Sequence, residues 1–170
     1  MPYSAEKTAQ VMWNVMDLGA VPDGQLNIVK RSDNLMVSDG CFTNQLDCGG
    51  VVEIRSRCVM KRFLVPEGFI VMIEGVSEWL VRPSCSEEWR HVTRDSGWGI
   101  VHPVAEGGLC QLQTGLHLQE NEWGLKMSDV SHKTPSLLSR GVGEVMIPSF
   151  RKIIESRHQL VDNKLLDSSL

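Results

Sequence analysis

The chain has 170 residues, a formal net charge of −4, and a composition of 42% hydrophobic and 22% charged residues. By surface scaling, a single domain of this size buries about 70% of the surface of its unfolded chain, so it needs no metal or disulfide to fold. The composition excludes a wholly disordered chain, and the longest apolar run, residues 69–73, is too short to span a bilayer. We therefore expect one soluble domain over residues 1–170.

The cysteine count bears on the compartment. There are five cysteines, an odd number, and Glu6 and Lys7 interrupt the only N-terminal stretch that resembles an apolar leader. These features predict a cytoplasmic protein in a reducing environment. The sequence pI of about 5.7 gives no overall electrostatic footprint for nucleic acid.

Residues 5–18 have helical periodicity. Ser4 is a typical N-cap, and Gly19 is a typical residue just past a helix C-terminus. Trp13 lies at the margin of the predicted apolar stripe. It either closes over the edge of the core or contacts a partner.

Residues 21–129 show short runs of period 2 separated by turn residues, which predicts a β-rich body. The expected strands cover residues 26–30, 35–37, 51–64, 69–74, 78–82, 89–93, 99–104, 109–113, 116–119 and 123–127. The clearest hairpin joins residues 59–64 to 69–74 through Pro66 and Gly68. Its second arm is apolar on both faces, so it is expected to lie centrally in the sheet.

The last part of the chain is predicted to be a loop over residues 131–147 and a helix over residues 149–166. The apolar positions of that helix recur at i, i+3, i+4 and i+7, and one of the positions on this stripe is Arg157. The predicted fold class is α+β, a mainly antiparallel β-sandwich or open barrel with an N-terminal and a C-terminal helix.

The sequence contains no motif that indicates a metal or cofactor site. Structural zinc usually needs close pairs of Cys or His ligands, and no such pair occurs. Phosphate-binding glycine motifs are also missing. No metal and no cofactor are therefore predicted.

Residues 85–102 are the richest stretch for nucleophilic catalysis. A small hydrolase would use Cys85 or Ser96 as the nucleophile and His91 or His102 as the base. However, the glycine that a nucleophile elbow places two residues before the serine is missing, which favours a β-turn over an active site.

A basic strand offers a second kind of site. On one strand, Arg55, Arg57 and Lys61 share a face with Glu53 and Val59, and Arg62 follows them in sequence. Such a ridge can bind nucleic acid phosphates or anionic lipid headgroups, or it can be a solvated face that discourages edge aggregation.

The five tryptophans complete the list of candidates, with Trp98 in a Gly-Trp-Gly setting as the best contact residue after Trp13. The missing catalytic motifs favour a non-enzymatic structural or interaction protein, which acts through surface contacts and self-association. An intracellular adaptor or a small viral matrix or accessory protein would be of this type. The alternatives are the hydrolase and a β-barrel that binds a small apolar ligand.

Overall fold

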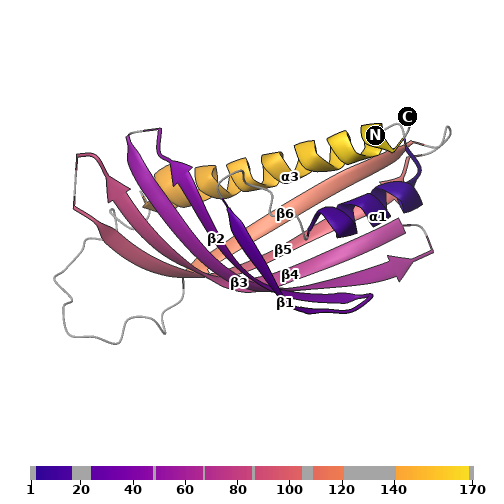
Figure 1. Ribbon diagram of the computed structural model, residues 1–170, viewed down its shortest axis with the longest axis horizontal. Coiled ribbons are helices and arrows are strands. Elements are labelled where there is room, and N and C mark those ends of the chain that lie inside the picture. Colours follow the sequence, from indigo (N-terminus) through magenta and orange to yellow (C-terminus); the bar gives the residue numbers. More distant parts are fainter. Residues whose placement is uncertain are drawn as a thin grey trace.

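The computed structural model describes residues 3–16, 24–47, 49–66, 68–85, 87–104, 109–120 and 141–168. One curved, six-stranded antiparallel sheet has its strands in sequence order, and helices α1 and α3 lie on the same face of it (Figure 1). The strands are β1 (Gln25–Arg31), β2 (Leu35–Gln45), β3 (Gly50–Val65), β4 (Gly68–Pro83), β5 (Trp89–Pro103) and β6 (Cys110–Glu120). The predicted α+β class, with an antiparallel sheet and a helix at each end of the chain, is confirmed.

Helix α1 (Ala5–Val15) begins as predicted, because the Ser4 hydroxyl accepts a hydrogen bond from the backbone N–H of Lys7. Its buried side includes Thr8, Ala9 and Met12, which lie on the predicted apolar stripe. The described helix ends at Val15, before the predicted residue 18, and Gly19 lies outside the described residues.

Four strands are longer than the sequence predicts. Strand β2 continues through Ser38-Asp39-Gly40, and β4 joins the two strands expected at 69–74 and 78–82. In the same way, β5 joins 89–93 to 99–104, and β6 joins 109–113 to 116–119. The predicted turns at Ser38-Asp39-Gly40, at residues 94–97 and at Thr114-Gly115 are wrong, because pairing with a neighbouring strand overrides the local turn preference of these residues. The expected strand at 123–127 lies outside the described residues.

The predicted hairpin is confirmed in its position and register. Val65 pairs with Gly68, and β4 lies between β3 and β5, so the strand that is apolar at its start is central as expected. Because β3 alternates between the two faces, Ile54 and Met60 point to the helices while Arg55 and Lys61 point away.

The C-terminal helical segment starts earlier than predicted. A short π-helix, η2 (Val142–Met146), leads directly into α3 (Ile147–Asp167), so the loop prediction for 131–147 is wrong over its last residues. Pro148 is the second residue of α3 and directly follows the π-helix, and because it has no N–H it cannot donate a helical hydrogen bond at this junction. Lys152 of α3 pairs with Asp47 after β2 at 3.1 Å, and Lys7 of α1 donates to the Ser168 carbonyl at the other end.

The space between helices and sheet holds two separate hydrophobic clusters. The first gathers α1 and the last turns of α3 against Met36, Met60 and Phe69. The second gathers η2 and the first turns of α3 against Phe42, Ile54 and Trp79, with the Phe150 and Trp79 rings in an edge-to-face contact at 5.1 Å. Helix α3 packs on α1 and η2 rather than closely on the strands, so it spans the sheet from one cluster to the other (Figure 1).

Neither helix in the described part of the chain combines the length and the apolar composition that crossing a bilayer requires.

Candidate ligand cavity

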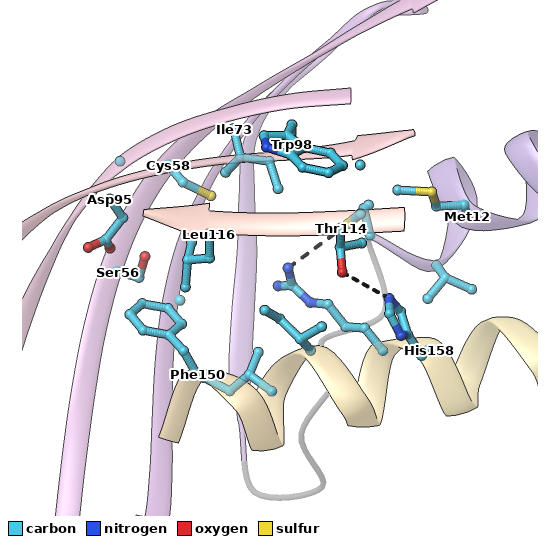
Figure 2. A pocket seen from close by; sticks show the side chains of 18 of the residues that line it. Met12, Ser56, Cys58, Ile73, Asp95, Trp98, Thr114, Leu116, Phe150 and His158 are labelled. Carbon is cyan, nitrogen blue, oxygen red and sulfur yellow. Dashed lines mark hydrogen bonds between the residues drawn. The ribbon is translucent and has the colours of Figure 1, made fainter. Parts of the chain in front are cut away.

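A cavity of about 110 Å³ lies between the sheet and the two helices. Met12 and Val161 of the first cluster and Phe42 and Ile153 of the second line it, so the cavity separates the two halves of the core. Figure 2 shows Asp95 and Phe150 at one end of this space and Met12 and His158 at the other. Apolar cavities of roughly 150 Å³ hold a benzene-sized molecule, so this space is on the scale of a small ring or a short alkyl chain.

Small side chains on the inner face of the sheet create the cavity. We call them the small-residue belt, and they are Ser38, Gly40, Ser56, Cys58, Gly75 and Gly99. Strand register places them side by side, because Ser38 pairs with Cys58 and Cys58 pairs with Gly75. Large buried residues flank the belt on β2, at Met36 and Phe42, and on β3, at Ile54 and Met60. The shorter side chains between them leave room under α3.

The belt ends at Asp95 of β5, which pairs with Gly75. This carboxyl is buried, with 5% of the residue exposed, and it accepts hydrogen bonds from the hydroxyls of Ser77 and Thr93. Thr93 in turn accepts from the indole N–H of Trp79 at 2.9 Å. Burial raises the pKa of Asp95, and the two hydroxyl donors oppose that rise in part.

Arg157 of α3 is the charged residue on the opposite wall. Its nearest polar contact is the thioether of Met16, with Nη1 4.0 Å from Sδ. None of the described carboxylates lies within 4.0 Å of the guanidinium. Burial lowers the pKa of Arg157, and the residue keeps some accessible surface because it faces the cavity.

Two further polar pairs line the walls. Thr114 Oγ1 of β6 and His158 Nε2 of α3 lie 3.4 Å apart, as the dashed line in Figure 2 shows. Ser38 Oγ and Cys58 Sγ lie 3.2 Å apart within the belt. The remaining lining is mostly aliphatic and aromatic, so the cavity is an apolar space with a few fixed polar groups.

The structure does not bring together the residues proposed for a hydrolase. His91 and His102 lie eleven positions apart on the same extended strand, which at strand rise separates them by about 36 Å. Ser96 is on the outer face, paired with Glu74 and His117, and Cys85 lies in the connection after β4. Ser96 lies five positions from His91 and six from His102 on this strand, about 16 and 20 Å at strand rise, so its hydroxyl is not within reach of either base.

The basic ridge is on the outer face, as the alternation predicts for Arg55, Arg57 and Lys61. Its arginines meet carboxylates: Arg55 lies 2.8 Å from Glu53, and Arg57 lies 2.7 Å from Asp39 on β2. The ridge is thus part of a ladder of alternating charges, which matches the solvated-face interpretation more closely than an open phosphate site.

Arg62 does not belong to that ridge. It is on the inner face of β3, where its Nε donates to Asn34 Oδ1 at 2.9 Å and its guanidinium lies 5.1 Å from the centre of the Trp13 ring. Trp13 is only 3% exposed and meets Phe69 edge-on at 6.5 Å, so of the two interpretations left open by the sequence, the structure shows the core position.

Trp98 is 38% exposed on the outer face of β5, where it pairs with Met72 and Gly115. Its ring lies over Gly115, since a Cβ on that glycine would be 2.6 Å from the indole. Gly99, next to it on the inner face, is covered by the Met12 side chain, since a Cβ on that glycine would be 2.5 Å from Met12 Cε. The expected exposure of Trp98 is therefore present, on the side of the sheet opposite to the helices.

Sequence reasoning did not single out the belt, Asp95 or Arg157 as a site. One signal was visible: Arg157 stands on the apolar stripe of the C-terminal helix, where a charge needs a reason. Of the belt residues, Ser38 and Gly40 have the composition of a turn, whereas Ser56 and Cys58 lie in the predicted strand 51–64. Their side-by-side position depends on a strand register that the sequence does not reveal.

Within the described residues, no three His, Cys, Asp or Glu side chains gather closely enough to hold a metal ion. No family model matches the chain, and no curated protein and no solved structure matches it significantly.

Proposed function

We propose that the protein binds a small, mainly apolar ligand in the cavity between its sheet and its helices. The single observation that carries this proposal is the small-residue belt, which holds the two halves of the core apart. Glycine inside a strand weakens it, and often marks a place where a ligand or another backbone approaches closely. Several small residues along one face of the sheet reduce the packing there and leave room for a ligand.

The lining supports the same function. Ligand sites in proteins are concave and mostly apolar, with a few polar groups that fix the orientation of the ligand. Here the apolar part comes from side chains such as Leu116, Phe150 and Ile154, and the polar groups are Asp95 and Arg157. The α3 helix bridges the cavity from both clusters, so the space is preformed.

The test is a titration with 1-octanol, followed by amide chemical shifts of the isotopically labelled protein. We expect saturable shifts that are centred on the belt. Ser56→Leu places a larger apolar side chain in the cavity and is expected to abolish these shifts. Ser96→Leu makes the same change on the outer face, so it is the matched control and is expected to keep them.

A second variant guards against a local folding effect of Ser56→Leu. Ile154→Phe fills the cavity from the helix side and is expected to block octanol as well. If the unmodified protein shows no saturable shifts, or if both filled variants bind octanol as well as the Ser96→Leu control, the ligand-binding function is wrong.

Contact with a protein partner is a second candidate, because Trp98 and Met72 are both exposed and adjacent on the outer face. Tryptophan is enriched among residues that dominate binding energy at interfaces. Under this function, light scattering would show self-association that Trp98→Ser removes, whereas a concentration-independent monomer would count against self-association through this face.

A further inference from the structure

We propose that the ligand of this cavity carries an anionic oxygen group, a carboxylate or a phosphate, which pairs with the guanidinium of Arg157. This inference rests on the ligand-binding function proposed above and names the class of ligand. It depends on a mismatch between the charge of Arg157 and its surroundings.

The guanidinium of Arg157 lies where an anionic group of a ligand in the cavity can pair with it. It projects from α3 into a mainly apolar cavity, and its polar contact within the described residues is the Met16 thioether sulfur at 4.0 Å, which is a weak acceptor. A guanidinium has five N–H donors in a planar fork, and that fork matches the two oxygens of a carboxylate or phosphate. No described carboxylate occupies this place.

The energetic cost of burying the charge of Arg157 indicates that this residue has a function in ligand binding. Burying a charge without a partner is unfavourable, and burial accordingly lowers the pKa of Arg157. A methionine or leucine at position 157 would continue the apolar stripe formed by Ile153, Ile154 and Val161 without that cost. An anionic ligand would supply the missing counter-charge in a place where water does not weaken the pair.

A cationic ligand that pairs with Asp95 is the competing interpretation. Asp95 already accepts two hydrogen bonds, from Ser77 and from Thr93, and its burial favours the neutral form. Each oxygen of Asp95 therefore already accepts a hydrogen bond, whereas Arg157 has no oxygen acceptor among the described residues. Thr114 and His158 lie at the end of the cavity away from Asp95 (Figure 2), so they add polar atoms there for a headgroup.

The rest of the cavity limits the ligand to an amphipathic molecule. The wall is mostly apolar, and side chains such as Leu112, Ile73 and Phe150 offer no hydrogen bond. A free inorganic anion would leave this apolar surface unfilled. The ligand is accordingly a short alkyl or aryl chain that ends in an anionic group.

Three probes of equal chain length test this inference: 1-octanol, octanoate and octyl phosphate, each titrated near pH 7.5 by amide chemical shifts. The unmodified protein is expected to bind at least one of the two anions roughly tenfold or more tightly than octanol, since a charged, bidentate hydrogen bond to a guanidinium is stronger than one to a neutral hydroxyl. The anion preferred by the protein distinguishes a carboxylate ligand from a phosphate ligand.

Arg157→Met is expected to remove the preference for the anion while octanol still binds. Arg157→Lys keeps the charge without the fork and is expected to restore part of the preference. Arg151→Met removes a charge from the exposed side of the same helix, and it is expected to leave the preference unchanged.

The outcomes separate the two proposals. If octanol and both anions bind the unmodified protein with equal affinity, the inference about the anionic group is overturned and the ligand-binding function stands. An anion preference that survives Arg157→Met also overturns it. If none of the three probes binds in the cavity, the ligand-binding function itself fails.

Discussion

Nη1 of Arg157 on α3 lies 4.0 Å from Sδ of Met16, the C-cap residue of α1, so the charge of one helix meets the soft sulfur of the other. A thioether is a poor substitute for a carboxylate or for water as a partner of a guanidinium. The contact therefore joins the two helices at the cavity without neutralising the charge. An apolar residue at position 157 would favour stability, whereas an arginine favours recognition of an anionic ligand.

The first prediction follows from that opposition. Arg157→Met is expected to raise the free energy of unfolding of the ligand-free protein by about 1 kcal/mol, since it removes a half-buried charge that has no carboxylate partner among the described residues. Urea unfolding near pH 7.5 measures the change. The control Arg151→Met, on the exposed side of α3, is expected to leave stability nearly unchanged, and a destabilised Arg157→Met would contradict this account of the residue.

The second prediction concerns the pH dependence that Asp95 imposes. Burial raises its pKa in the folded state, so the folded protein holds a proton that the unfolded chain releases at lower pH. The stability contributed by this group is complete below the unfolded pKa, near pH 4, and is lost as the pH rises through the folded pKa. Asp95→Asn does not titrate, and its side chain can still accept from Thr93.

The stability of Asp95→Asn relative to the unmodified protein is accordingly expected to improve as the pH is raised from about 4 toward neutral. Urea unfolding at a series of pH values measures this difference. A difference that stays constant over the range, or that shrinks toward neutral pH, would show that burial does not shift the pKa of this carboxyl upward.

The third prediction tests which side of α3 faces the core. Leu165 is 0% exposed in the first cluster, whereas its neighbour Leu166 is 58% exposed. Leu165→Ala is expected to cost about 2–5 kcal/mol of stability through lost burial and a new cavity, and Leu166→Ala about 0.5 kcal/mol or less. Thermal or chemical unfolding of the two variants measures both losses of stability. Similar losses would mean that α3 turns a different side toward the core.

Much of the fold follows from the sequence because the patterns that predict it are local. The Ser4 cap, the alternation along residues 51–64 and the hairpin at Pro66 each depend on neighbours in the chain. The alternation predicts correctly that Arg55 and Lys61 point away from the core.

The cavity did not follow from the sequence because its residues imitate turns. Ser38-Asp39-Gly40 and Asp95-Ser96-Gly97 have the composition of β-turns, yet they lie inside β2 and β5. At these places small residues serve the shape of the inner face, so local preference and tertiary role disagree. Such disagreements are expected at functional sites.

The partner of the charge at position 157 also depends on long-range structure. The sequence shows an arginine on an apolar stripe, but only the packing of α3 against α1 and the sheet places it in a cavity. The same limit applies to Trp13 and Trp98. Trp13 is buried in the first cluster and Trp98 lies on the outer face, and their immediate neighbours in the sequence do not determine this difference.

The most direct test of the central claim is a crystal structure of the protein with 8-bromooctanoate, located by the anomalous signal of bromine. The account predicts a bromine peak between the two core clusters and the carboxylate about 3 Å from the guanidinium of Arg157. Bromine found only on the outer surface, with side chains of the clusters closed over the belt and no ligand between them, would contradict it.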